Sequence, residues 1–243
     1  MHNSDAHLVE HYSHLTNFNR DFRNANLFRL VATLVTGKSV VDIGCGAGFF
    51  LGMLAGEKRT LMGIEPNEGM RALAHTLNPQ IKVVSGSAED IGTLITTPVE
   101  CITMLDVLEH VKDDSAQVQR TWSALSPGGE FIIVVPAYPF LYGERDKNMG
   151  HYRRYSKQAL ETVLTANGFV VESMRYWNTL GVLPYAVSEK ILHRPLRVRL
   201  REEAEGGVLR TFLQKVLHFW VREFENRFSI GFGLSIICVA KKV

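Results

Sequence analysis

The sequence has few cysteines, no long apolar run and almost no net charge, and each shortage argues against a class of protein. Its three cysteines lie within or beside apolar stretches without metal-ligand spacing, so we expect buried, reduced thiols in a cytoplasmic protein. No apolar run reaches about 18 residues, so no transmembrane helix is expected. The polar N-terminus lacks the pattern of a secretory signal. A net charge of +2 gives no overall argument for a nucleic-acid partner.

What the 243 residues do contain is the composition of a globular protein with a substantial core, 46% hydrophobic and 21% charged. This length fits a single domain that carries an insertion. Short apolar segments alternate with helical patterns, which predicts repeated βαβ units and a parallel sheet. We expect strands at 40–43, 60–65, 81–84, 99–105, 130–136, 169–177 and 234–242.

A glycine-rich turn follows the first expected strand. Gly44, Gly46 and Gly48 stand on alternate positions, and an apolar segment at 49–55 reads as a helix. A strand, a glycine turn and a helix bring bare backbone close to a nucleotide-like ligand, because a Cβ would block that approach. The spacing is Gly-x-Gly-x-Gly, unlike the Gly-x-Gly-x-x-Gly of dinucleotide binders, and no Lys-Ser/Thr pair follows as in a phosphate loop.

With Asp42 two residues before Gly44, this run resembles the first motif of class I S-adenosylmethionine-dependent methyltransferases. Leu-Asp-x-Leu-Glu-His at 105–110 and Leu-x-Pro-Gly-Gly-x-Phe-x-x-x-Val-Pro at 125–136 resemble later motifs of the small-molecule members. The resemblance covers about 38–178 and 234–242. It implies a Rossmann-like α/β fold: a seven-stranded, mostly parallel sheet with helices on both faces and an antiparallel last strand.

The resemblance also implies where the cofactor binds. Glu65 ends the second expected strand, 17 residues beyond Gly48, where α/β nucleotide binders place a carboxylate for the ribose hydroxyls. A solvated charge or a helix-capping partner is the alternative for this residue. Where the family often has an acid for the adenine amino group, this chain has Ser87, which leaves its neighbours as candidates. The predicted cofactor site is Asp42, Gly44, Cys45, Gly46, Gly48, Glu65, Pro66, Ser87, Ala88, Glu89, Leu105 and Asp106.

The segment 138–155 is the most distinctive polar stretch, with four tyrosines, a histidine and several arginines. Its place after the fifth strand implies an acceptor pocket, whereas a solvated connection is the plainer interpretation. His151 is the leading candidate for a general base, since an ordinary histidine pKa of about 6.5 suits that role. His110 and Glu109 are the next candidates. Arg153 and Arg154 suit an anionic group of the substrate, or a helix start that pairs with Glu161.

We therefore predict methyl transfer from S-adenosylmethionine to a small-molecule or lipid- or saccharide-linked acceptor, more readily at oxygen than at nitrogen. A nucleic-acid acceptor is disfavoured because the Asn/Asp-Pro-Pro-Tyr/Phe signature is missing after 99–105. Two alternatives stay open. One is a cofactor-binding protein without transferase activity. The other is a metal-assisted enzyme like some quinone-precursor O-methyltransferases, with Asp106, Glu109 and His110 as ligands; the primary prediction assigns no metal ligand.

The remaining segments flank or interrupt the predicted core. Residues 1–36 read as a helical cap, from which Tyr12 and Arg23 are the candidates for contact with the cofactor. Residues 179–233 read as an insertion, with an apolar start, a basic stretch at 193–201 and a helix at 208–228. Packing on the domain or on a second copy is one interpretation, and a membrane-surface or lipid lid is the other. The apolar stripe of that helix is Leu209, Phe212, Leu213, Val216, Leu217, Trp220 and Phe224.

Overall fold

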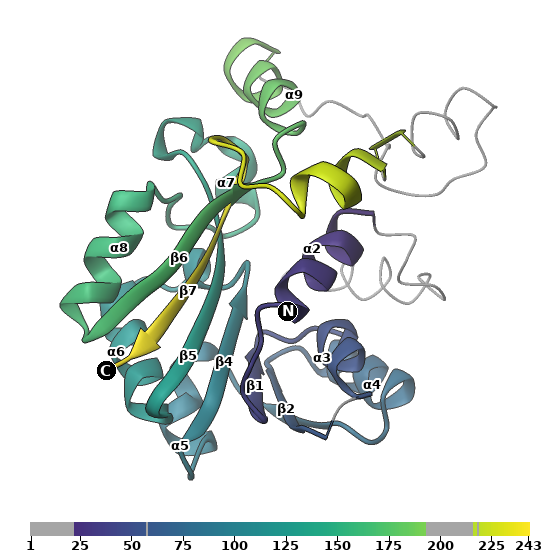
Figure 1. Cartoon of the computed structure of the whole chain (residues 1–243), viewed down its shortest axis with the longest axis vertical. Helices are drawn as coiled ribbons and strands as arrows, with labels where there is room; N and C mark the ends of the chain where they lie inside the picture. Colours follow the sequence, from purple (N-terminus) through teal and green to yellow (C-terminus); the bar gives the residue numbers. More distant parts are fainter. Residues whose placement is uncertain (1–21, 57, 193–215, 218) are drawn as a thin grey trace.

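The computed structural model describes residues 22–56, 58–192, 216–217 and 219–243. In this part of the chain seven strands form one sheet in the order β3-β2-β1-β4-β5-β7-β6, flanked by helices (Figure 1). The pairs from β3 to β5 are parallel, and β7 runs antiparallel to both β5 and β6. This confirms the predicted Rossmann-like sheet. The strands are β1 (Ser39–Ile43), β2 (Thr60–Glu65), β3 (Lys82–Ser85), β4 (Val99–Leu105), β5 (Leu125–Pro136), β6 (Phe169–Trp177) and β7 (Ser235–Lys242).

The strands are apolar on both faces because helices cover both faces of the sheet. On β5, Phe131 and Ile133 belong to one core cluster, together with Leu160 of a helix that precedes β6. Ile132 points the other way and packs with Leu27 of the first described helix. The alternation of side chains along a strand thus divides one apolar run between two cores.

Three α-helices of the described chain begin at a residue whose side chain caps the first turn. Asn67 accepts a hydrogen bond from the Met70 N–H, and Ser156 accepts one from the Ala159 N–H. The α-helices are α2 (Phe22–Ala32), α3 (Phe49–Leu54), α4 (Glu68–Leu77), α5 (Ile91–Leu94), α6 (Asp114–Ala124), α7 (Glu144–Asn148), α8 (Lys157–Ala166) and α9 (Val182–Val187). Shorter helical turns are η2 (Ala88–Asp90), η3 (Leu108–His110), η4 (Pro139–Leu141), η5 (Ser188–Leu192) and η6 (Val221–Glu225).

The largest difference from the predicted strand bounds is at β5. β5 begins at Leu125 instead of residue 130, because Leu125 pairs with Val99 across a shift in register. In its described part the stripe predicted on the 208–228 helix is divided, since Val216 and Phe224 are exposed whereas Trp220 packs against a core cluster together with Val221. Predictions for Tyr12, for the basic stretch 193–201, and for Leu209, Phe212 and Leu213 lie outside the described residues.

The carboxyl ends of β4, β5 and β6 share an uncommon backbone feature. Each is followed within two residues by a non-glycine residue with positive φ: Asp106 at 56°, Tyr138 at 64° and Asn178 at 67°. Residues other than glycine rarely adopt this backbone conformation unless their surroundings enforce it, and such residues cluster at functional sites. β4 and β5 finish at the end of the sheet that Figure 1 shows beneath α7 and α9, and this end holds the candidate site.

Candidate active site

The glycine turn after β1 has the geometry that its sequence predicts. Gly44, Gly46 and Gly48 all have positive φ, at 71°, 53° and 73°. A Cβ built on Gly44 would lie 2.6 Å from Cγ2 of Val107, so the turn lies directly against the end of β4. Residues with side chains would therefore be strained here and would also collide with the neighbouring strand end. The bare backbone is left free to line a ligand site.

Glu65 lies beside this turn and contacts its backbone. It is buried at the end of β2, and its two carboxylate oxygens accept hydrogen bonds from the N–H groups of Gly46 and Asn67, each at 2.9 Å. Each carboxylate oxygen can accept more than one hydrogen bond, so capacity remains for ligand hydroxyls. A glycine turn beside a fixed carboxylate fits an adenosyl cofactor, with Glu65 on the ribose and the turn against the amino-acid portion.

Asp42 lies beneath this turn on β1. It is buried and accepts a hydrogen bond of 2.6 Å from the Thr103 hydroxyl of β4. Burial raises its pKa to about 7, against the Thr103 hydrogen bond, and Glu65 adds to the rise. Asp42 thus joins β1 to β4 directly behind the turn. Cys45 packs with Leu51 and Ile81 in a small apolar cluster.

The predicted adenine-side residues follow β3. Ser87 forms a capping box with Asp90, whose Oδ2 accepts from both the N–H and the hydroxyl of Ser87 at 2.7 Å. Glu89 and Pro66 are exposed, and Ala88 is half-buried. The structure therefore ties Ser87 into a local cap and leaves the carboxylate of Glu89 open to solvent. The roles of these residues toward a cofactor stay predictions.

Asp106 stands at the mouth of the site after Leu105, the half-buried last residue of β4. Its carboxylate forms an ion pair of 2.8 Å with Arg23 of α2, and Arg23 also reaches Ser235 at the start of β7. The cap helix is thereby attached to the end of β4. Arg23 was a predicted contributor, and the structure places it beside a predicted cofactor residue.

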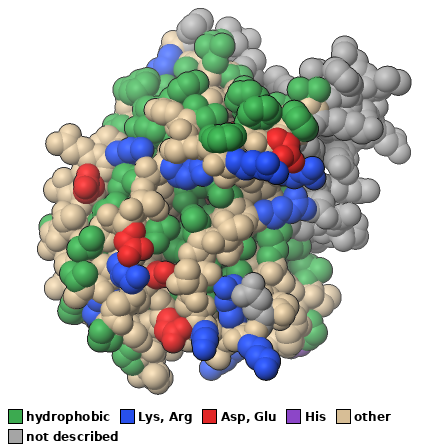
Figure 2. Space-filling model, in the orientation of Figure 1, with side chains coloured by type: hydrophobic (Ala, Val, Ile, Leu, Met, Phe, Trp, Pro, Cys, Tyr) green, Lys and Arg blue, Asp and Glu red, His purple; other side chains and the backbone are tan. Residues whose placement is uncertain are grey.

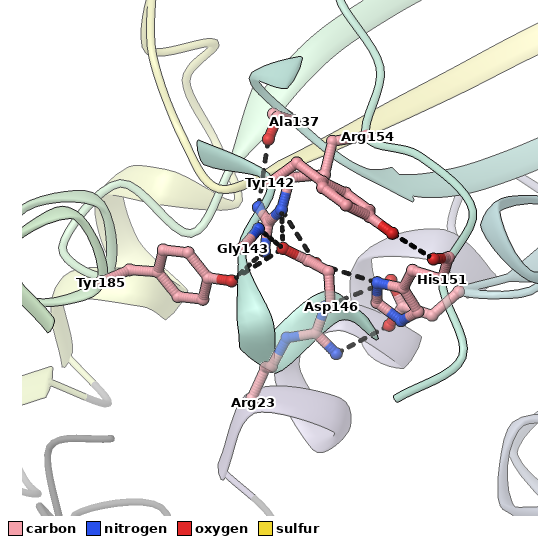
Figure 3. Close-up of polar contacts among 9 residues, drawn as sticks. Arg23, Ala137, Tyr142, Gly143, Asp146, His151, Arg154 and Tyr185 are labelled. Atoms are coloured by element: carbon pink, nitrogen blue, oxygen red, sulfur yellow. Dashed lines mark hydrogen bonds and ion pairs between the residues drawn. The ribbon is translucent and has the colours of Figure 1, made fainter. Parts of the chain in front are cut away.

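A buried charge cluster lies in the part of the site where the sequence predicts the acceptor pocket, with Asp146 of α7 at its centre (Figure 3). We refer to this part, built from residues 138–155 and Tyr185, as the acceptor half. Nδ1 of His151 lies 3.0 Å from Asp146 Oδ1. Arg154 Nε donates to both carboxylate oxygens at 2.9 and 2.8 Å. The Tyr185 hydroxyl of α9 donates to Oδ2 at 3.2 Å and accepts a hydrogen bond from Arg154. Side chains from the loop after α7 and from α9 thus enclose one carboxylate.

The charge state of Asp146 determines how His151 is protonated. Burial alone would raise the pKa of Asp146, but the hydrogen bonds from His151 and Arg154 outweigh it and hold the pKa well below its usual range. An ionised carboxylate only accepts hydrogen bonds, so Nδ1 of His151 must carry the proton. Nε2 of a neutral His151 is then left with a free lone pair, which is the requirement for a general base.

His110 and Glu109, the other two candidates for the general base, lie beside His151. The sequence did not predict that these three residues meet. The two imidazole rings meet edge to face with centroids 4.6 Å apart. Desolvation of the His110 ring by the surrounding protein lowers the pKa of His110, and the neighbouring His151 lowers it further. Burial and the nearby Asp106 raise the pKa of Glu109 well above its usual range, and its Oε2 has no hydrogen-bond partner. Ligand atoms of Glu109, His110 and His151 lie within 4.8 Å of one another.

The two arginines of the loop pair with carboxylates other than Glu161. Arg154 is buried against Asp146 and the Ala137 carbonyl, and Arg153 forms a 2.8 Å ion pair with Asp114. The predicted pairing with Glu161 is therefore wrong, and a role toward an anionic group of the substrate stays a prediction. Sequence reasoning also missed Asp146, which looked like one more charge in a polar loop, and Tyr185, which lies in the insertion.

Comparison with known proteins finds methyltransferases among the relatives of this chain. A probable S-adenosylmethionine-dependent methyltransferase of Mycolicibacterium smegmatis is 26% identical over 162 residues, which cover 66% of this chain and 61% of that protein. A ubiquinone biosynthesis O-methyltransferase of Pseudomonas fluorescens is 32% identical over 113 residues, covering 44% and 49% respectively. The chain thus spans less than two thirds of the length of either relative.

Structural comparison extends the likeness to nearly the whole chain. A Haloferax volcanii protein, solved in complex with the methyltransferase activator Trm112, aligns with a TM-score of 0.66 at 14% identity and covers 99% of this chain and 98% of its own. At that identity the likeness shows the fold alone. The family model described as a methyltransferase domain matches residues 12–174, which is more than half of the chain. The chain belongs to this methyltransferase domain family, as a class I member whose cofactor is S-adenosylmethionine.

Proposed function

We propose that this protein transfers a methyl group from S-adenosylmethionine to an oxygen atom of a small-molecule or lipid- or saccharide-linked acceptor, with His151 as the general base. The observation that carries this proposal is the Asp146–His151 pair at the end of β5. When bound, the cofactor supplies a methyl group on a sulfonium sulfur, which an acceptor oxygen takes as the carbon–sulfur bond breaks. The name of the Pseudomonas fluorescens relative also supports an oxygen acceptor.

In this proposal one group of residues binds the cofactor and another takes part in proton transfer. The turn at Gly44–Gly48 and Glu65 bind and orient the cofactor. Nε2 of His151 takes the hydroxyl proton of the acceptor, and Asp146 stabilises the resulting imidazolium. Arg154 and Tyr185 hold Asp146 in place, so the imidazole keeps one orientation. A positioned base of this kind contributes about 10²- to 10⁴-fold to the rate.

Metal-assisted transfer is a second candidate because Glu109, His110 and His151 are gathered as a potential ligand set. The partnerless Oε2 of the buried Glu109 supports it, and Nε2 of His151 would then serve as a ligand, with Asp146 orienting the ring from behind. Activity after chelation and dialysis separates the candidates. Transfer that survives chelation supports the base mechanism, whereas transfer that requires added Mn²⁺ or Zn²⁺ supports the metal.

The proposal is tested first by calorimetric titration with S-adenosylmethionine and S-adenosylhomocysteine. The native chain should bind both saturably. Glu65→Ala should weaken binding by roughly a hundredfold, because two charge-assisted hydrogen bonds to the ribose are lost. Glu172→Ala is the matched control, since Glu172 is an exposed carboxylate on β6 that pairs with Lys241. Absence of binding to the native chain would overturn the assignment.

Transfer itself is then followed with methyl-labelled cofactor and a panel of phenols, catechols, saccharides, lipid extracts and amines. Label on oxygen supports the proposal, and label on nitrogen overturns the choice of acceptor atom. Saturable cofactor binding without transfer to any member of the panel would favour a binding protein without transferase activity.

A further inference from the structure

The described residues between β6 and β7 carry an unusual share of the exposed apolar surface. Thirteen large apolar side chains are exposed in the described chain, and seven of them lie between residues 180 and 232. We refer to these seven as the insertion surface. Figure 2 shows apolar side chains gathered at this end of the molecule, where Figure 1 places α9. The insertion surface is Leu180, Leu183, Val216, Phe219, Phe224, Phe228 and Phe232.

The segment around η6 is attached to the domain by both apolar and polar contacts. Val221 is buried, and Trp220 packs against the same core cluster. The Glu225 carboxylate accepts from the Thr179 hydroxyl at 2.7 Å, and Asn226 Oδ1 accepts from Trp177 Nε1 at 3.0 Å. Meanwhile Phe224 and Phe228 face outward. An amphipathic helix on a globular protein normally buries its apolar side and exposes its polar side. Phe224 and Phe228 are apolar side chains that lie outside these buried contacts, so they are available to an apolar partner.

The charges around the insertion surface indicate the nature of this partner. In the described parts of 179–192 and 216–233, the exposed charged residues are Lys190, Arg222 and Arg227, all basic. Glu189 is half-buried and Glu225 is buried, while Glu223 is half-buried between Arg222 and Arg227, with which it pairs. Phenylalanine and leucine beside exposed lysine and arginine is the pattern of interfacial segments on anionic bilayers. A symmetric pairing of two copies would instead bring like charges together.

The insertion surface is also connected to the acceptor half of the site. On α9, Leu183 points outward while Tyr185, two residues later, hydrogen-bonds Asp146 and stacks on the Arg154 guanidinium at 4.4 Å. Lys190 donates to the Tyr142 carbonyl of the acceptor loop at 3.3 Å. A planar partner on this surface would therefore lie next to the site. Among the described residues no helix has the length and apolarity to cross a bilayer.

We propose that the insertion surface docks on an anionic lipid bilayer and holds the acceptor half of the site against it. Docking itself does not depend on the chemistry of the site. That the acceptor is carried by the membrane is the part that rests on the proposed function. The acceptor class is then a lipid or a lipid-linked saccharide that presents its hydroxyl at the bilayer surface.

Vesicle flotation with the full chain tests the docking. Phosphatidylcholine vesicles with phosphatidylglycerol should bind the protein, phosphatidylcholine vesicles alone should bind it more weakly, and salt should weaken the difference. Leu183→Glu and Phe228→Glu should each reduce binding on the order of tenfold, because an apolar anchor becomes a charge. Val243→Glu is the matched control, since Val243 is 77% exposed and Leu183 is 73% exposed. Lys190→Gln and Arg227→Gln should each cost about fivefold, on anionic vesicles only.

Three outcomes would overturn the proposal. The first is that native protein floats with neither kind of vesicle. The second is that Val243→Glu loses as much binding as Leu183→Glu. The third is a dimer by light scattering that Leu183→Glu dissociates without vesicle binding in either form, which would assign the surface to a second copy. Calorimetry with S-adenosylhomocysteine on the same samples keeps the two proposals separate. Cofactor binding without vesicle binding refutes only the docking, and vesicle binding without cofactor binding refutes only the proposed function.

Discussion

The two halves of the candidate active site differ in the chemical groups that form them. The cofactor half consists of backbone amides, three glycines and the buried carboxylates of Asp42 and Glu65, and its key contact joins Gly46 to Glu65 across 19 positions of the chain. The acceptor half is a cluster of buried charges around Asp146, in which Tyr185 comes from 39 positions away. The glycine turn thus depends on backbone geometry set by closely spaced residues. The acceptor half depends on side chains that the fold brings together from more distant segments.

The largest expected effect would separate catalysis from cofactor binding. His151→Asn keeps an amide that can donate to Asp146, but this side chain cannot take a proton from an acceptor. We expect methyl transfer to fall by about 10²- to 10⁴-fold, while the affinity for S-adenosylhomocysteine, which depends on the other half, stays unchanged. The rate of transfer and calorimetry measure the two quantities. His75→Asn on the exposed end of α4 is the control. A full rate in His151→Asn would remove His151 as the base.

The next effect concerns folding and would show how much the acceptor half contributes to stability. Asp146→Ala leaves the buried Arg154 guanidinium without its carboxylate, which we expect to lower the free energy of unfolding by about 3–5 kcal/mol. Urea denaturation measures it. Asp113→Ala removes an N-cap of α6 and should cost only about 1 kcal/mol. Equal losses in the two variants would mean that the cluster around Asp146 is no more than an ordinary surface contact.

A pH-dependent effect of similar size belongs to the cofactor half. The pKa of Asp42 is about 7 in the folded protein and 3.8 ordinarily, with burial as the main cause. Between these values the folded protein keeps a proton that the unfolded chain releases, so this residue makes stability fall as pH rises, up to about pH 7. Asp42→Asn cannot titrate. From pH 5 to pH 8 the variant should gain about 3 kcal/mol relative to the native chain, two pH units at about 1.4 kcal/mol each.

Thermal or urea unfolding at the two pH values checks this sign. A relative loss for Asp42→Asn at pH 8 would mean that Asp42 is ionised and favourably paired in the folded protein. The amide oxygen that this substitution introduces can still accept from the Thr103 hydroxyl, so the variant tests the charge more than the hydrogen bond.

The same comparison explains which features could be predicted from the sequence. The bounds of β2, β4 and β6 and the glycine turn follow from local patterns of apolar residues and glycine, and the structure agrees with them. Asp146 could not be recognised, because its importance arises from Arg154 and Tyr185, which reach it only in the folded chain. The sequence left open whether Val216 and Phe224 are exposed, since an apolar stripe does not reveal whether it faces a core. The roles of these residues depend on their contacts in the folded chain more than on their residue type.

The smallest predicted effect lies where the two halves meet. Arg23 of the cap helix pairs with Asp106, and both side chains are partly open to solvent, so Arg23→Gln should lower stability by no more than about 1 kcal/mol. If the pair only fastens α2, the affinity for S-adenosylhomocysteine will stay within about twofold, whereas a cap that closes over the ligand would lose several-fold. Arg29→Gln, an exposed arginine on the same helix, is the control. A several-fold loss of this affinity in Arg23→Gln alone would mean that the cap helix is part of the cofactor half. The cofactor half would then, like the acceptor half, include a residue that reaches the site only through a tertiary contact.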